Sequence, residues 1–186
     1  YAGIHHDLGK ALIPQDILNY GKFTDPGQYE QIKFHPLYGA AVVNLAIQVA
    51  EKVGGPSLVH PFLHFLRGAA LLHHQKKTGG GYPAIELEPG SAHPLANDEI
   101  PLMVCVLALC DSYIALRFPR SYKPAIPHHD AFETLRSGDT SSPDFFSGRS
   151  QPGQSIYGQK AWSLFEENQV MFMQIADAAL SKIQKN

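Results

Sequence analysis

The placement of proline and glycine constrains the fold of this chain more than any other feature of its sequence. Breakers such as Gly54-Gly55-Pro56 and the glycine run at 79–81 are far apart, and the stretches between them exceed the about 5–6 residues of an ordinary strand. The apolar run from Leu102 to Leu109 could by itself be a buried strand, but the length of its segment favours a helix. The sequence therefore predicts an all-α fold.

The expected helices follow from these breakers and from capping residues. Asp25, Pro26 and Gln28 form a helix start, with Asp25 as N-cap and Pro26 in the first position. The expected helices cover approximately residues 15–19, 26–34, 35–53, 57–74, 97–116, 128–136 and 160–183, the last within a C-terminal segment 158–186. Residues 76–97 are expected to form a loop. Residues 138–157, which are rich in Gly, Ser and Pro, are expected to form a flexible loop.

Length and composition predict a single domain over residues 1–186. Of the 186 residues, 44% are hydrophobic, which is enough for one packed core and too few for two. The net charge of −2 argues against binding to a nucleic-acid polymer but allows a small anionic substrate. The longest apolar stretches are too short to span a bilayer, so no membrane segment is expected. Cys105 and Cys110 share one apolar run, where a disulfide has poor geometry, and they indicate a reducing cytoplasm.

Histidine is abundant, with 10 residues of which several form adjacent pairs. Histidine is the commonest metal ligand among side chains, so the positions of these residues matter. His6 is followed directly by Asp7, which offers one nitrogen and a carboxylate whose two oxygens can bridge two cations. Lys10 lies one helical turn after Asp7 on the same side. It is therefore placed to meet a phosphate bound to those cations.

Further residues complete a candidate metal site. His35 lies at an expected helix start, and His73-His74 end the next long helix. Asp111 ends a buried apolar run, where a carboxylate needs a partner. The candidate ligands comprise four imidazoles and two carboxylates: His6, Asp7, His35, His73, His74 and Asp111. Such a set suits two borderline cations such as Fe, Mn or Zn better than Mg or Ca.

Two alternatives for the ligands remain open. His60 and His64 are one helical turn apart and could chelate a metal on one helix face. His5 could also take the place of His6, although only His6 adjoins Asp7.

The order of these motifs resembles that of HD-GYP domains, a branch of the HD superfamily of metal-dependent phosphohydrolases. The similarity covers roughly residues 1–135 and includes an HD motif, a second histidine motif, a paired-histidine and GYP signature, a distal aspartate and a basic segment. These are, in order, His6-Asp7-Leu8-Gly9-Lys10 with Ile13-Pro14, His35-Pro36 with Gly39, His73-His74 with Gly79, Gly81, Tyr82 and Pro83, Asp111-Ser112-Tyr113 with Ala115-Leu116, and Arg120-Ser121-Tyr122-Lys123.

The resemblance implies a fold and a function. The fold would be an HD-domain helical bundle around a dinuclear or trinuclear centre, with Fe or Mn favoured and Zn allowed. The activity would be hydrolysis of cyclic di-GMP, a bacterial second messenger, to linear pGpG, to GMP, or to both. The family's helices upstream of the HD motif are absent from this sequence.

The resemblance also implies roles for individual residues and a set of partners. Asp7 and Lys10 would be catalytic, and Lys10, Gly81, Tyr82, Arg120 and Lys123 would bind the cyclic dinucleotide. The GYP loop would offer a docking surface for a GGDEF-type or other signalling protein, and a homodimer is compatible with the family. The domain would be cytoplasmic, within a parent protein that is free or membrane-anchored.

Several positions depart from the family pattern and motivate alternatives. The glutamate that follows the histidine pair is Gln75, the aromatic residue and aspartate before the GYP glycines are Lys77 and Thr78, and the second acid of the distal motif is Ile114. One alternative is a weak or inactive module that binds a cyclic dinucleotide or a protein for signalling. Another keeps catalysis but changes the substrate to a different cyclic dinucleotide or a nucleoside monophosphate.

Overall fold

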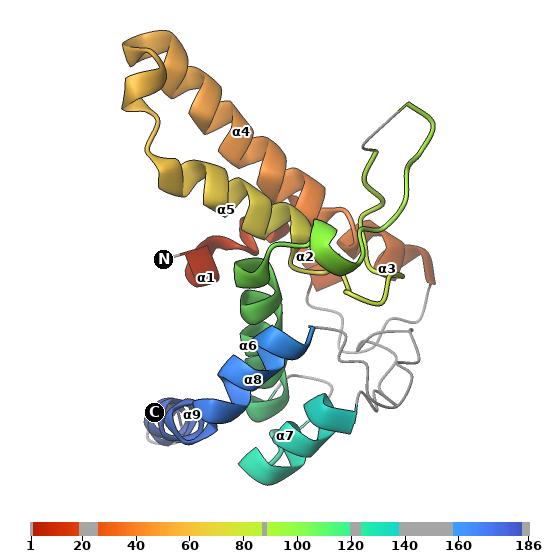
Figure 1. The fold of residues 1–186 in the computed structure, drawn as a ribbon, viewed down its shortest axis with the longest axis vertical. Helices are drawn as coiled ribbons and strands as arrows, with labels where there is room; N and C mark the ends of the chain where they lie inside the picture. Colours follow the sequence, from red (N-terminus) through yellow and green to blue (C-terminus); the bar gives the residue numbers. More distant parts are fainter. Residues whose placement is uncertain (1, 19–25, 87–88, 120–123, 138–157, 184–186) are drawn as a thin grey trace. The chain divides into compact units, whose positions relative to one another are not determined.

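The structure is a computed structural model that describes residues 2–18, 26–86, 89–119, 124–137 and 158–183. Over these residues the predicted all-α fold is confirmed, and the sole pairing of extended backbone is an isolated antiparallel bridge between Ile85 and His93 (Figure 1). None of the described helices is long and apolar enough to cross a membrane. The described chain forms two compact units, 1–75 with 81–95 and 76–80 with 96–186. A single domain over residues 1–186 stays a prediction.

The first unit is built on a hairpin of two helices, α4 (His35–Gly54) and α5 (Pro61–Leu72), which run side by side in opposite directions (Figure 1). Val43, Ile47 and Leu66 form its buried apolar core. Five short elements complete the unit: α1 (Ala2–His5), the 3₁₀ turn η1 (Leu8–Leu12), α2 (Gln15–Leu18), α3 (Pro26–Ile32) and the 3₁₀ turn η2 (Pro56–Leu58). The antiparallel arrangement brings the start of α4 next to the end of α5.

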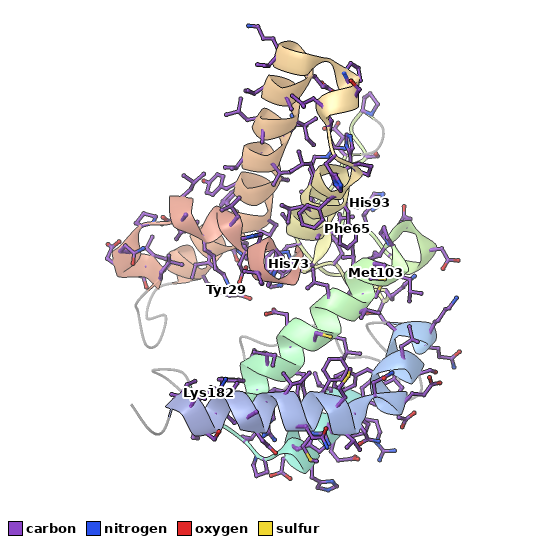
Figure 2. All side chains as sticks on the ribbon, turned by 90° about the vertical axis from the view of Figure 1, so that its left-hand side faces the viewer. Tyr29, Phe65, His73, His93, Met103 and Lys182 are labelled. Carbon is purple, nitrogen blue, oxygen red and sulfur yellow. The ribbon has the colours of Figure 1, made fainter. Side chains whose placement is uncertain are left out.

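Residues at the turn of the hairpin determine where α4 ends and where α5 begins. Gly55 stops α4 with a φ of 73°, which favours glycine, and its N–H binds the carbonyl oxygen of Glu51 at 2.8 Å. The helix expected from residue 57 instead begins at Pro61, because His60 is its N-cap and accepts a hydrogen bond from the N–H of Phe62 at 3.1 Å. Phe65 of α5 is 36% exposed, and its side chain is labelled in Figure 2.

The second unit surrounds the apolar helix α6 (Leu102–Arg117), which packs against α7 (His128–Ser137) and α8 (Gln159–Glu167). The remaining elements are the 3₁₀ turn η3 (Asn97–Glu99) and α9 (Gln169–Ile183). Tyr113, which is fully buried, makes edge contacts with Phe165 and Phe172 in the aromatic centre of this unit. The run from Leu102 to Leu109 is therefore helical, as its length predicts.

Two helix boundaries in the second unit differ from expectation. Helix α6, which was expected to begin at residue 97, begins after Pro101. The ring of a proline clashes with a helical conformation of the residue before it, so the helix does not extend back across Pro101. The long final helix is interrupted at Asn168, whose side-chain amide donates to the carbonyl oxygen of Leu164 at 2.8 Å. Such a local bond competes with the regular helical pattern. The N-cap Asp25 and the loop 138–157 lie outside the described residues.

Candidate metal centre

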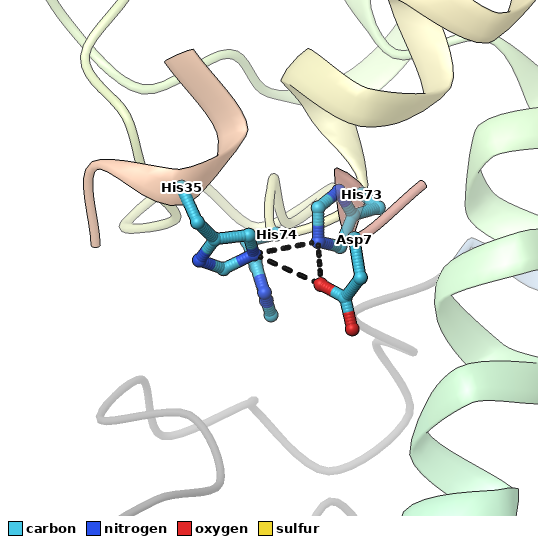
Figure 3. A group of neighbouring side chains, drawn as sticks. All are labelled: Asp7, His35, His73 and His74. Carbon is cyan, nitrogen blue, oxygen red and sulfur yellow. Dashed lines mark hydrogen bonds and ion pairs between the residues drawn. The ribbon is translucent and has the colours of Figure 1, made fainter. Parts of the chain in front are cut away.

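The α4–α5 hairpin brings two histidines from distant parts of the sequence into contact. His35 opens α4 and His73 follows α5, and both side chains are almost fully buried. Their Nε2 atoms lie 3.1 Å apart. Oδ1 of Asp7 is 3.2 Å from Nε2 of His35 and 3.6 Å from Nε2 of His73 (Figure 3). With His74, these residues place four ligand atoms within 4.8 Å of one another.

Asp7 reaches the hairpin because η1 packs directly against the backbone of α4. A Cβ added at Gly9 would lie 1.9 Å from the carbonyl oxygen of His35 and 2.4 Å from the backbone nitrogen of Gly39. These distances are far below van der Waals contact, so only glycine fits at position 9. A Cβ at Gly39 would meet the nitrogen of Gly9 at 3.2 Å and the Cβ of Ala70 at 3.3 Å, which is tight. The small residues thus set the approach of the HD motif to His35.

Hydrogen bonds determine which nitrogen of each imidazole carries the proton. Nδ1 of His35 lies 2.7 Å from the carbonyl oxygen of Ile32, and Nδ1 of His73 lies 2.9 Å from that of Ala70. A carbonyl oxygen only accepts, so Nδ1 is the donor in both rings. In the neutral imidazoles the lone pairs of both Nε2 atoms then point into the cluster. Metal-binding histidines have this arrangement, with the outer nitrogen donating to a carbonyl.

The electrostatics of the cluster favour neutral rings at His73 and His74 beside an ionised Asp7. Burial lowers the pKa of His73. Burial, followed by the neighbouring His73 and His35, lowers the pKa of His74 well below its ordinary value. Burial would raise the pKa of Asp7, but the imidazoles of His35 and His73 and the charges of Lys10 and His6 hold it well below its usual range. A hydrogen bond from these imidazoles to Asp7 needs a proton on Nε2 as well as on Nδ1, whereas a divalent cation would satisfy the carboxylate and both Nε2 lone pairs together.

His6 lies at the edge of this cluster. Its Nε2 is 3.5 Å from Oδ2 of Asp7, and its ring centroid is 4.7 Å from that of His73. Nδ1 of His6 lies 2.8 Å from the carbonyl oxygen of Gly3, so its tautomer follows the same rule. His6 is buried whereas His5 is exposed, which favours His6 over His5 as the candidate metal ligand. The role of His6 as a ligand stays a prediction.

The remaining candidate residues differ in how far the structure places them. Nζ of Lys10 pairs with Oδ2 of Asp7 at 2.6 Å, on the side expected from its spacing. Asp111 is half-buried on α6, in the second unit, and its role as a ligand stays a prediction. Arg120 and Lys123 lie outside the described residues. Among the described residues, Asp7, His35, His73 and His74 form the one group of three or more such side chains that could hold a metal, and it does not include the His60–His64 pair.

The GYP segment contacts the cluster through Tyr82. Its ring stacks on that of His74, with centroids 4.4 Å apart and planes inclined by 20°. Gly81 and Pro83 on either side are buried. Gln75, singled out in the sequence only as a departure from a family pattern, is also buried, and its amide makes two hydrogen bonds. Its position directly after the predicted ligands His73 and His74 was the one sign in the sequence that Gln75 could support the site.

Comparison with known proteins places the chain in a family. No family model matches it. It is 39% identical over 134 residues, 72% of its length, to a cyclic di-GMP phosphodiesterase of Vibrio cholerae. It is 35% identical over 123 residues, 66% of its length, to a cyclic di-GMP phosphodiesterase of Pseudomonas aeruginosa.

The chain is a divergent HD-GYP domain. A third relative, which is 30% identical over 122 residues or 63% of this chain, is a 3′3′-cGAMP-specific phosphodiesterase of Vibrio cholerae. The chain spans 24% of the length of the first two relatives and 19% of the third. The HD-GYP domain thus corresponds to a minor part of each relative.

The donor set of this HD-GYP domain fits a metal. Imidazole nitrogens with a carboxylate are typical ligands of Zn, Fe and Mn. The two oxygens of Asp7 face different partners, Oδ1 toward His35 and His73 and Oδ2 toward His6 and Lys10. A carboxylate whose two oxygens both face such partners could bridge two cations, and that role of Asp7 stays a prediction.

Proposed function

We propose that this HD-GYP domain is a metal-dependent phosphodiesterase that hydrolyses cyclic di-GMP to linear pGpG, to GMP, or to both. The observation that carries the proposal is the convergence of the Nε2 lone pairs of His35 and His73 on the ionised carboxylate of Asp7. The names of the two cyclic di-GMP phosphodiesterase relatives support the same substrate.

In this proposal the site residues have separate roles in metal binding, charge stabilisation and nucleotide binding. Asp7, His35, His73 and His74, joined by His6 and Asp111, would hold two or three divalent cations, Fe or Mn in preference to Zn. Bound cations of this kind make a nucleophile available from water at neutral pH and stabilise charge on phosphoryl oxygens. Lys10 would donate a hydrogen bond to a phosphoryl oxygen as charge develops on it. Gly81 and Tyr82 would contact the nucleotide.

Arg120 and Lys123 would hold the second phosphate of the cyclic dinucleotide, since a guanidinium can bind a phosphate through two hydrogen bonds. A GGDEF-type signalling partner at the GYP loop, a homodimer and a cytoplasmic location also remain predictions. They rest on the family resemblance.

The test is anaerobic incubation of the Fe-loaded or Mn-loaded domain with cyclic di-GMP, followed by chromatography of the products. Formation of pGpG or GMP, abolished in an Asp7→Ala variant, supports the proposal. Binding of intact cyclic di-GMP without turnover would replace it with a binding module. The relative that is specific for 3′3′-cGAMP motivates a parallel incubation with that substrate. Faster turnover of 3′3′-cGAMP would keep the chemistry and change the substrate.

A further inference from the structure

The buried side chain of Gln75 ties three parts of the first unit together. Gln75 follows His74 directly and is 5% exposed. Its Nε2 donates to the carbonyl oxygen of Pro83 at 2.6 Å, and its Oε1 accepts from the N–H of Leu95 at 2.8 Å. Because a carbonyl only accepts and a backbone N–H only donates, the amide has one satisfactory orientation. Both ends of its polar group are used in that orientation.

The segment held by Gln75 carries Tyr82. Tyr82 immediately precedes Pro83, and its backbone N–H donates to the carbonyl oxygen of His74 at 3.3 Å. Its ring stacks on the imidazole of His74. The bond from Gln75 therefore fixes Pro83, and Pro83 adjoins Tyr82, whose ring covers that of His74.

His74 differs from the other two histidines of the cluster. Nδ1 of His35 and Nδ1 of His73 each lie within hydrogen-bonding distance of a backbone carbonyl. Within the described residues the ring of His74 makes no such bond, and its contacts are with the rings of His35, His73 and Tyr82. A metal-binding imidazole is ordinarily oriented by a hydrogen bond from its outer nitrogen. The stacked ring of Tyr82 is the contact available to take over that function.

We propose that Gln75 is a positioning residue that holds Tyr82 against His74 and so orients the one imidazole of the cluster that lacks a hydrogen bond from its ring within the described part of the chain. The proposal rests on the metal centre of the proposed function. The proposal also predicts that an amide and a carboxylate differ at this position. A glutamate carboxylate of the same shape would set an acceptor against the carbonyl oxygen of Pro83 and lose that bond.

A first experiment uses the metal-free protein, so its outcome does not depend on metal binding. The imidazole protons of His74, assigned by NMR, are expected to show an upfield ring-current shift from Tyr82. Tyr82→Leu should remove that shift, and Gln75→Glu and Gln75→Met should each reduce it to a similar extent. Gln48→Glu, at an exposed position of α4, makes the same charge change and should leave it in place. An unchanged His74 shift in both Gln75 variants would overturn the proposal.

A second experiment measures the affinity for Mn²⁺ at temperatures well below the melting temperature of each variant. Gln75→Met and Tyr82→Leu are each expected to weaken binding by about 10- to 100-fold, the usual effect of removing a residue that orients a ligand. If Gln75 acts through Tyr82, the double variant should bind Mn²⁺ about as well as the single variant with the lower affinity.

Losses that multiply in the double variant would show that Gln75 acts independently of Tyr82 and would contradict the proposal. Absence of Mn²⁺ binding by the unaltered protein would instead contradict the proposed function. The NMR comparison would still decide the role of Gln75.

Discussion

The two ends of the α4–α5 hairpin contrast in how their side chains are held. At one end His35, Pro36, Gly39 and Ala40 of α4 are buried, and polar atoms meet in directed contacts around Asp7. At the other end Leu45, Val49 and Val53 of the same helix are 61%, 53% and 78% exposed. An apolar hollow of about 480 Å³ lies there, lined by residues that include Val42 and Leu58. The directed contacts at the cluster end require particular side chains, whereas the exposed residues at the far end are expected to tolerate substitution.

The largest effect is expected from Gly9→Ala. The added methyl group would overlap the carbonyl oxygen of His35, so η1 would have to move away from α4 and carry Asp7 with it. Metal content by elemental analysis and turnover should both fall to background. Gly39→Ala is the matched control, because its methyl group meets its neighbours at 3.2 and 3.3 Å and needs a small shift. Full metal content and turnover in Gly9→Ala would show that the close approach of Gly9 is not what places Asp7.

The next comparison separates two residues within the cluster end. Asp7→Ala removes the carboxylate shared by the cluster, so metal loading and hydrolysis should fall together. Lys10→Ala should leave the metal content intact and slow turnover by roughly 10²- to 10³-fold, the scale for one lost stabiliser of developing charge. Parallel elemental analysis and kinetics measure both effects. Loss of metals from Lys10→Ala, or full metal content and activity in Asp7→Ala, would contradict these assignments.

A substitution in the core between the two ends should affect stability rather than chemistry. Leu66 is 6% exposed and packs with Val43 and Ile47. Leu66→Ala should lower the free energy of unfolding by about 2–5 kcal/mol. The metal affinity of the protein that remains folded should stay unchanged. Urea unfolding and metal titration would measure the two quantities, and a weakened metal affinity at full folding would show that the core and the cluster are coupled.

The smallest effect is expected at the far end. Leu45→Ser and Val53→Ser replace exposed side chains, so each should change the free energy of unfolding by no more than about 0.5 kcal/mol. Metal content and turnover should match those of the unaltered protein. A loss comparable to that of Leu66→Ala would show that this surface is structurally important and would remove the contrast between the two ends.

Local patterns in the sequence were sufficient to predict most of the helices, though not α1 or the break between α8 and α9, and to predict the four members of the cluster. The helical segments around His35 and His73, joined at a Gly-Gly-Pro break, form a hairpin that necessarily places these residues together. The exact starts at Pro61 and Leu102 were missed because capping and proline geometry override apolar spacing. The contact of Gly9 with Gly39 and the two bonds of Gln75 were not predicted, because both join residues distant in sequence.

X-ray absorption spectroscopy of the Zn-loaded domain tests the central claim most directly, since the lone pairs of His35 and His73 converge on Asp7 for a cation. The account predicts imidazole scattering from several histidines at about 2.0–2.1 Å with a carboxylate oxygen at a similar distance. The imidazole contribution should decrease in a His73→Ala variant. A zinc shell without imidazole, or one unchanged by His73→Ala, would contradict the assignment of this cluster as the metal centre.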